Sequence, residues 1–196
     1  MHKSRLEAFS DGVIAIIITI MVLELRAPHD VGIDALRPLI PVFLSYVLSF
    51  VFIAIYWNNH HHLLQAAERV NGAILWANVH LLFWLSLVPF VTGWMGENHF
   101  EAVPVALYGG VLLMCGVAYT ILCRTLIAHH GADSALAQAV GSDRKGKISL
   151  ALYAGAVPLA FASPPLACAV YVVVAVMWLI PDRRIERRIA TRSRTP

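Results

Sequence analysis

Apolar segments of helix length alternate with short polar segments along this chain, a pattern typical of a protein built from membrane-spanning helices. Six such segments can be distinguished, and the first runs from about Arg5 to Leu23. It reaches the ~20 residues that a spanning helix needs only if Asp11 enters the membrane with it. The other five lie at residues 38–57, 73–94, 104–127, 148–162 and 166–180. The last two are short, so we expect them to be tilted or extended into their polar flanks.

The composition agrees with this pattern. Of the 196 residues, 59% are hydrophobic and only 14% are charged, whereas soluble domains carry about 25% charged residues. The three cysteines lie in apolar segments without CxxC spacing, and we interpret them as small buried side chains. The sequence therefore predicts an all-α, polytopic membrane protein with six transmembrane helices. Residues 1–181 form the six-helix unit, and residues 182–196 form a basic tail.

The distribution of Lys and Arg predicts the orientation in the membrane. Six spans place both termini on one side. With the termini inside, 13 of the 15 basic residues lie on inner segments, and only Arg26 and Arg37 lie on outer loops. The positive-inside rule therefore places both termini in the cytoplasm. The outer loops instead carry five acidic residues: Glu24, Asp30, Asp34, Glu97 and Glu101. These residues either form an outer vestibule that attracts cations or are ordinary solvated loop residues.

The arginine-rich tail is interpreted as a topology signal and a contact for anionic membrane lipid. It follows directly after the last apolar segment, so we do not expect it to bind nucleic acid. Glu7 and Asp11 at the head of the first segment argue against a cleavable signal peptide. Because no sorting signal is recognised, we expect a multi-pass protein in the plasma membrane of a prokaryote.

The first apolar segment has two features that need an explanation. Ile16, Ile20 and Leu23 recur at i, i+4 and i+7 with Thr19 beside them, so they form one stripe on a helix. From spacing alone, such a stripe is typical of a helix face in contact with lipid or with the protein core. Asp11 is an ionisable group at membrane depth, and such a group needs a charged or hydrogen-bonding partner.

Candidate partners of Asp11 are expected near the same side of the membrane. Side chains that can donate to its carboxylate, or join a network around it, are Arg5, Trp57, His60 or His61, and Asn78. The sequence leaves open which histidine takes part, and histidines exposed at the membrane interface are the alternative. A metal site at residues 60–62 is not expected, because consecutive helical side chains point about 100° apart and cannot converge on one ion.

Recognisable catalytic motifs are absent from the sequence. It contains no HExxH, Gly-x-Ser-x-Gly or Walker motif, so we expect neither an enzyme nor a bound cofactor. It also lacks the Thr-Val-Gly-Tyr-Gly stretch with which many potassium channels build a filter from backbone carbonyls.

Arg5-x-x-x-Phe9-Ser10-Asp11, at the start of the first segment, resembles the signature of the transmembrane protein 175 family. This family comprises the endolysosomal potassium channel of animals and its bacterial homologues. All four defining positions are present, and a single six-helix unit is similar to that of the bacterial members. The resemblance implies a homotetramer in which the four first helices line one central pore.

The resemblance also implies roles for individual residues. In the family, bulky apolar rings narrow the pore five, nine and twelve residues after the motif Asp, and Ile16, Ile20 and Leu23 occupy those positions here. Thr19 is the implied polar ligand for a partly dehydrated ion. The motif Arg, Ser and Asp are implied to brace the first helix against the second and third.

We therefore predict a potassium-permeable cation channel whose first-helix stripe acts as a hydrophobic gate and a weak selectivity filter. The expected partners are potassium ions that bind transiently, membrane lipid and further copies of the chain. A proton-coupled secondary transporter that uses Asp11 and nearby histidines is the main alternative. A membrane-embedded enzyme or an assembly scaffold is the third hypothesis.

Overall fold

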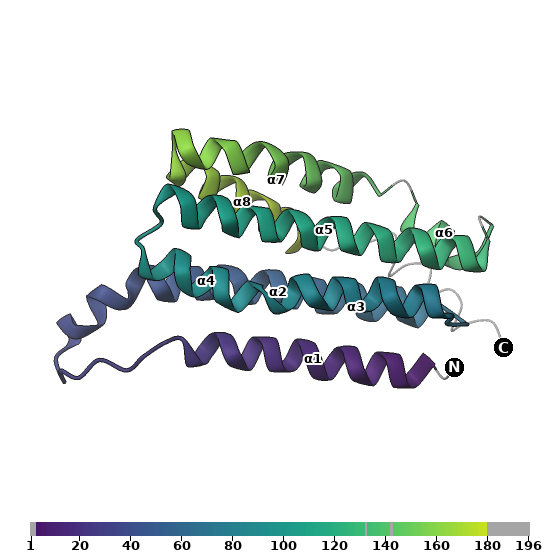
Figure 1. Ribbon diagram of the computed structural model, residues 1–196, viewed down its shortest axis with the longest axis horizontal. Coiled ribbons are helices and arrows are strands. Elements are labelled where there is room, and N and C mark those ends of the chain that lie inside the picture. The colour runs from purple at the N-terminus through teal and green to yellow at the C-terminus, as the bar shows by residue number, and fades with distance from the viewer. Residues whose placement is uncertain (1–2, 132, 142, 180–196) are drawn as a thin grey trace.

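The computed structural model describes residues 3–131, 133–141 and 143–179, and every regular element within these ranges is helical. The predicted basic tail, residues 182–196, lies outside the described residues. The elements in chain order are α1 Lys3–Leu23, the 3₁₀ helix η1 Ile33–Leu39, α2 Ile40–Ala66, α3 Gly72–Ser86, α4 Val88–Glu97, α5 Ala102–His130, α6 Ala135–Val140, α7 Arg144–Ala162 and α8 Pro164–Leu179 (Figure 1).

The predicted all-α membrane fold is confirmed. Within the described residues, four helical stretches are long and apolar enough to cross a membrane: residues 3–23, 33–66, 72–97 and 102–130. Helix α8 is apolar but has only 16 residues, and α7 has 19 residues with Pro158 inside it. Each of the six predicted segments coincides with one helix or one pair of helices, and the number of true spans stays a prediction.

Several helix boundaries differ from those predicted, and two of the differences concern α2 and the third segment. Helix α2 continues to Ala66, nine residues beyond the predicted apolar segment, and the three consecutive histidines lie within it, which agrees with the helical geometry used to exclude a metal site there. The third predicted segment is divided at Leu87 into α3 and α4, with Pro89 in the first turn of α4. Proline has no backbone N–H and is tolerated there because the first turn of a helix lacks intrahelical acceptors in any case.

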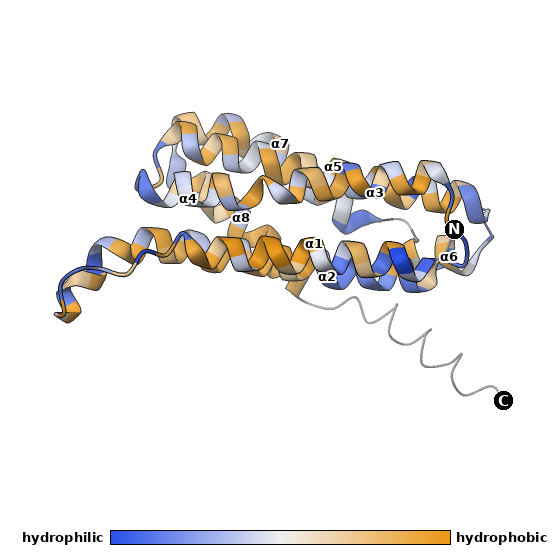
Figure 2. Cartoon of the chain, turned by 60° about the horizontal axis from the view of Figure 1, so that its bottom comes forward, coloured by the Kyte–Doolittle hydropathy of each residue, from blue (hydrophilic) through white to orange (hydrophobic). Residues whose placement is uncertain are grey.

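The helices run lengthwise beside one another, and α1 lies along one edge of the bundle (Figure 1). It packs against α2, α3 and α4, whereas α5 packs against α3, α4, α7 and α8. Figure 2 shows apolar residues along the middle of the bundle and polar residues gathered towards its two ends. This distribution is the one expected of a protein whose middle lies in hydrocarbon and whose ends meet water.

A chain of hydroxyl groups ties α4 to α2 and α5 inside the bundle. Ser49 Oγ lies 2.6 Å from Thr92 Oγ1 and 3.0 Å from Tyr108 Oη. Thr92 donates to the Val88 carbonyl at 2.7 Å, so the hydroxyls can be satisfied in sequence from Tyr108 to Val88. These bonds hold α4, one of the helices on which α1 rests, in a fixed place.

Candidate pore helix and polar network

Helix α1 has a buried face and an exposed face. Its buried residues are Leu6, Ser10, Ile14, Ile17 and Met21. Their spacing of three to four residues places them on one side of the helix, which is the side that contacts α2, α3 and α4. The opposite face is exposed, and none of the elements that the structure describes covers it.

The predicted pore stripe occupies this exposed face. Ile16 is 58% exposed, Ile20 43% and Leu23 75%, so none of them belongs to the core of the chain. Thr19 is also exposed, and its hydroxyl donates to the carbonyls of Ala15 and Ile16 at 2.8 and 3.0 Å. With its hydrogen used inside the helix, the Thr19 oxygen can act only as an acceptor towards other groups.

A groove of about 440 Å³ runs between α1 and α4. It is lined by two residues of the predicted stripe together with other, mostly apolar, residues: Val13, Ile16, Ile17, Ile20, Glu24, Ser86, Pro89 and Phe90. The groove is open along one side, so a single chain does not enclose a passage at this place. Any ion path along α1 must therefore be completed by another surface.

The carboxylate of Asp11 accepts a hydrogen bond, as an ionisable group in a membrane helix is expected to do. The indole Nε1–H of Trp57, on α2, donates to Asp11 Oδ1 at 3.0 Å. The ring of His61 stacks on the Trp57 ring, with 5.9 Å between centroids. His61 therefore contacts Trp57 and not Asp11 itself. Among the described residues, no hydrogen bond joins His61 to Asp11.

A second, fully buried chain of hydrogen bonds joins α1 to α2 and α3. His60 Nε2 lies 2.7 Å from Asn78 Oδ1, and Asn78 Nδ2 donates to Ser10 Oγ at 2.9 Å. Ser10 in turn donates to the Leu6 carbonyl at 2.8 Å. Because the amide oxygen of Asn78 can only accept, His60 must donate from Nε2. His60, left open beside His61 by the sequence, is the histidine that joins this chain.

Arg5 and Phe9 do not join the network within one chain. Both side chains are exposed, and Phe9 is 56% accessible. Among the described residues, Arg5 forms no ion pair with Asp11. Arg5, Phe9, Gly12 and Ile16 follow one another at helical spacing, so the motif residues Arg5 and Phe9 lie on the same face as the stripe.

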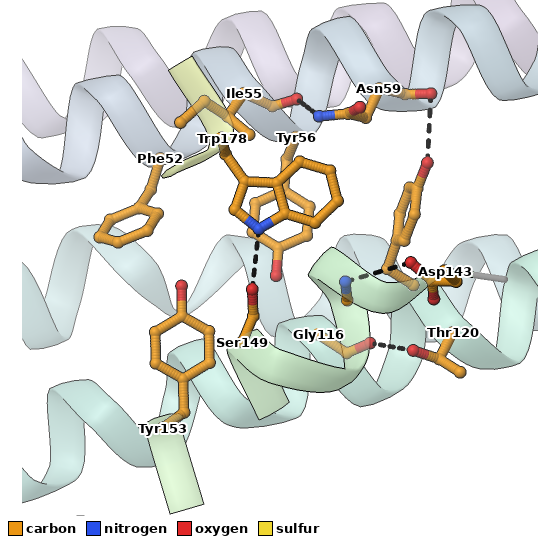
Figure 3. Close-up of a pocket in the computed structure, with 12 residues that line it drawn as sticks. Phe52, Ile55, Tyr56, Asn59, Gly116, Thr120, Asp143, Ser149, Tyr153 and Trp178 are labelled. Carbon is orange, nitrogen blue, oxygen red and sulfur yellow. Dashed lines mark hydrogen bonds between the residues drawn. The ribbon is translucent and has the colours of Figure 1, made fainter. Parts of the chain in front are cut away.

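One cavity was not predicted from the sequence. It has a volume of about 40 Å³ and lies between α2, α5, α7 and α8 (Figure 3). Five of its twelve lining residues are aromatic, and the others include the polar Asn59 and Asp143. The ring of Tyr153, which is 3% exposed, lies beside that of Phe52, with 6.3 Å between centroids. A cavity of this size holds a few water molecules at ~10–15 Å³ each. The aromatic residues come from four separate helices, so no local sequence signal marks them as a group.

The fold and the site together define a polytopic, all-helical membrane protein whose first helix carries an uncovered apolar face above a buried polar network. A model of the family described as "Endosomal/lysosomal potassium channel TMEM175" matches residues 5–89, which include the motif, Trp57, His60 and Asn78. A potassium channel of Chryseobacterium sp. (strain P1-3) is 52% identical over 189 residues, which are 96% of this chain and 98% of the relative. The chain therefore belongs to the TMEM175 family.

Other relatives agree with this assignment. A potassium channel of Chamaesiphon minutus is 35% identical over 146 residues, or 70% of each protein. The endosomal/lysosomal proton channel TMEM175 of Gallus gallus is 32% identical over 124 residues, which are 54% of this chain and 25% of the relative. The crystal structure of a lysosomal potassium-selective channel TMEM175 homologue from Chamaesiphon minutus superposes with a TM-score of 0.77 at 30% identity, covering 91% of this chain and 96% of that one.

Proposed function

We propose that this chain is the subunit of a homotetrameric, potassium-permeable cation channel in the plasma membrane of a prokaryote. Four copies of α1 surround one pore, and six helices of each chain span the membrane with both termini in the cytoplasm. The observation that carries the proposal is the place of Ile16, Ile20 and Leu23 on the exposed face of α1. Relatives that match most of this chain are named potassium channels, which supports the choice of ion.

The position of α1 supports an ion path between chains and not within one. Helix α1 lies at the edge of the bundle (Figure 1). Its groove against α4 is open. Lipid could cover an apolar face without any loss, so apolar character alone does not indicate a pore. Thr19 and Glu24 lie on or next to the same face, and these polar groups suit a water-filled pore better than a lipid contact.

Gating then follows from the size and polarity of the stripe. Rings of Ile16 and Ile20 from four chains make a narrow apolar constriction, which excludes water and ions when it is closed. Tilting or rotating the four α1 helices widens the ring and lets water enter. Selectivity comes from the cost of stripping water from the ion, partly offset by the Thr19 oxygen, so we expect only weak preference for potassium over sodium.

The polar network at the base of α1 sets the angle of the helix. The bonds from Trp57 to Asp11 and from Asn78 to Ser10 fasten α1 to α2 and α3. Arg5 and Phe9 point away from the chain and, in the proposed tetramer, contact neighbouring subunits. A change in these contacts is transmitted to the ring at Ile16, since both lie on one rigid helix.

A proton-coupled transporter is the second candidate, because His60, Asn78 and Ser10 form a continuous hydrogen-bonded chain. A transporter would move protons and its substrate in a fixed ratio, and its rate would saturate with substrate concentration. A channel shows neither property. Flux measurements in sealed liposomes therefore separate the two mechanisms.

The decisive experiment is potassium flux into liposomes for the wild type, Ile16→Asn and Val22→Asn. Val22 is also exposed on α1, at 43%, but it lies off the stripe and serves as the matched control. We expect Ile16→Asn to raise basal flux several-fold and to lower the preference for potassium, because an amide wets the constriction. Val22→Asn should behave like the wild type. Equal flux in all three, with folded and inserted protein of tetrameric mass, would remove Ile16 from the gate.

A further inference from the structure

Two neighbouring histidines at the end of α5 hold the loop that joins α2 to α3. His130 Nε2 lies 3.0 Å from the backbone nitrogen of Glu68 and 3.2 Å from that of Arg69. On the other side of the same ring, Nδ1 lies 2.9 Å from the Leu126 carbonyl oxygen. The imidazole thus bridges its own helix and a loop about 60 residues earlier in the chain.

The donors and acceptors around His130 determine its protonation state. A carbonyl oxygen can only accept, so Nδ1 carries a hydrogen and donates to Leu126. The two backbone N–H groups can only donate, so Nε2 must be unprotonated and accept from both. An imidazolium has hydrogens on both nitrogens and cannot accept, so protonation of His130 removes both bonds to the loop.

His129 repeats this arrangement one residue earlier. Asn71 Nδ2 donates to His129 Nδ1 at 3.2 Å, while Asn71 Oδ1 accepts from Ile74 N at 2.9 Å and caps α3. The amide orientation is set by the cap, so His129 Nδ1 must also be unprotonated. The two rings are perpendicular, with 5.3 Å between centroids. Protonating one ring would bring a positive charge next to the other.

Protons can reach these rings, because His129 is exposed and His130 is half-buried. The charged and titratable side chains on the elements around them are of both signs: Glu68 and Arg69 on the loop, Lys3 and Glu7 on α1, His61 and His62 on α2, Arg124 on α5, and Asp133 after α5. Helix α6, Ala135–Val140, carries no titratable side chain. Lys3 Nζ also donates to the carbonyl of Gln65 in the last turn of α2, so α1 contacts α2 just before this loop.

We propose that His130 and His129 form a pH-sensitive latch on the α2–α3 loop. When both rings are neutral, they hold residues 67–71 in place. The same bonds then hold the C-terminal end of α2, which carries Trp57 and His60, and the N-terminal end of α3, which carries Asn78. When protonated, they release the loop, the support under Ser10 and Asp11 loosens, and flux falls because α1 is no longer held in place. The last step rests on the proposed function. The predicted orientation places the latch on the cytoplasmic side.

The latch itself is tested by hydrogen exchange, which needs no channel activity. The amides of Glu68 and Arg69 should lose about tenfold in protection between about pH 7.5 and pH 5.5 in the wild type, because a protonated His130 cannot accept from them. His130→Gln keeps a neutral oxygen acceptor and cannot be protonated, so it should keep its protection at both values. His130→Lys cannot accept and should show low protection at both. His29→Gln, in the loop after α1, should behave like the wild type.

Equal wild-type protection at both pH values, or the same loss in His130→Gln, would overturn the latch. Potassium flux tests its effect on the pore. We expect at least a twofold fall in wild-type flux when the pH on the latch side is lowered to about 5.5, and no such fall in His130→Gln. An equal fall in both would overturn the link from latch to pore. Absence of flux in every variant would instead contradict the proposed function, while the exchange result would still decide the latch.

Discussion

At the scale of single residues, Asn78 is the side chain on which the buried network depends. Its amide links the two other side chains, because Oδ1 accepts from His60 and Nδ2 donates to Ser10. All three side chains are at most 1% exposed. A buried polar group without a partner is costly in a membrane, so these three residues stabilise the bundle only as a set.

Replacing Asn78 by Ala should lower the free energy of unfolding by about 1–3 kcal/mol, because the Nε2–H of His60 is left buried without an acceptor. Chemical denaturation in detergent measures the change. Val79→Ala is the matched control, since Val79 is the next residue of α3 and is 43% exposed. Equal losses in the two variants would show that Asn78 contributes only its volume.

At the scale of elements, helix ends are set by local capping as well as by hydrophobic length. Helix α7 begins at Arg144, four residues before the predicted apolar segment, because Asp143 Oδ1 accepts from Gly146 N at 3.1 Å. Asp143 has a left-handed backbone with φ of 40°, a conformation that Asp tolerates better than most residues. The cap thus extends α7 into a basic turn that hydropathy alone assigns to a loop.

This cap should be pH-dependent. Burial raises the pKa of the Asp143 carboxyl above its ordinary 3.8, although the Gly146 N–H and the charges of Lys147 and Arg124 oppose the shift. A raised pKa in the folded state means that the native protein binds the proton more tightly, so this group's contribution to stability falls as pH rises through the raised value. Asp143→Asn keeps the cap without the charge and should gain stability relative to the wild type over that window.

Thermal unfolding in detergent, followed from about pH 4 to pH 7, compares the wild type with Asp143→Asn and Asp143→Ala. Asp143→Ala loses the cap and should be less stable by about 0.5–2 kcal/mol throughout. A constant difference between the wild type and Asp143→Asn would mean that the Asp143 carboxyl does not titrate differently in the folded state.

At the scale of the whole molecule, the chain is a helical bundle with an exposed apolar helix face at one edge. Helix α1 lies at that edge (Figure 1). One of its faces belongs to the continuous core that it shares with the other helices, and the opposite apolar face is exposed. The termini of α1 and α5 that carry Lys3 and His130 lie at the same end of the bundle, next to the α2–α3 loop. The orientation of this end relative to the cytoplasm decides which compartment the latch senses.

Cysteine labelling tests this orientation. Single-cysteine variants Asp30→Cys and Asp133→Cys, made in a background in which Cys115, Cys123 and Cys168 are replaced by Ala, lie at exposed positions on opposite sides of the predicted topology. We expect a membrane-impermeant thiol reagent to label Asp30→Cys from outside intact cells and Asp133→Cys only after the membrane is opened. The reverse pattern would invert the topology and place the latch on the outer side.

Much of the fold could be predicted because hydrophobic length is a local property. All six predicted segments fall in helices, and the motif at Arg5 to Asp11 led to the family that the comparisons establish. The break at Leu87 and the extension of α2 to Ala66 escaped this reasoning. Both depend on how a proline and a polar turn pack against the neighbouring helices. A hydropathy pattern carries no information about such packing.

The sequence by itself determined that the chain is helical, that it lies in a membrane, and that Ile16, Ile20 and Leu23 share one face of α1. These are consequences of composition and helical period, and each needs only residues close together in the chain. Only the tertiary structure decided that this face is the uncovered one, that His60 pairs with Asn78, and that His130 holds the backbone of Glu68 and Arg69. The side chains in these contacts lie 18 to 62 residues from their partners, and the packing of whole helices, not local pattern, brings such groups within hydrogen-bond distance.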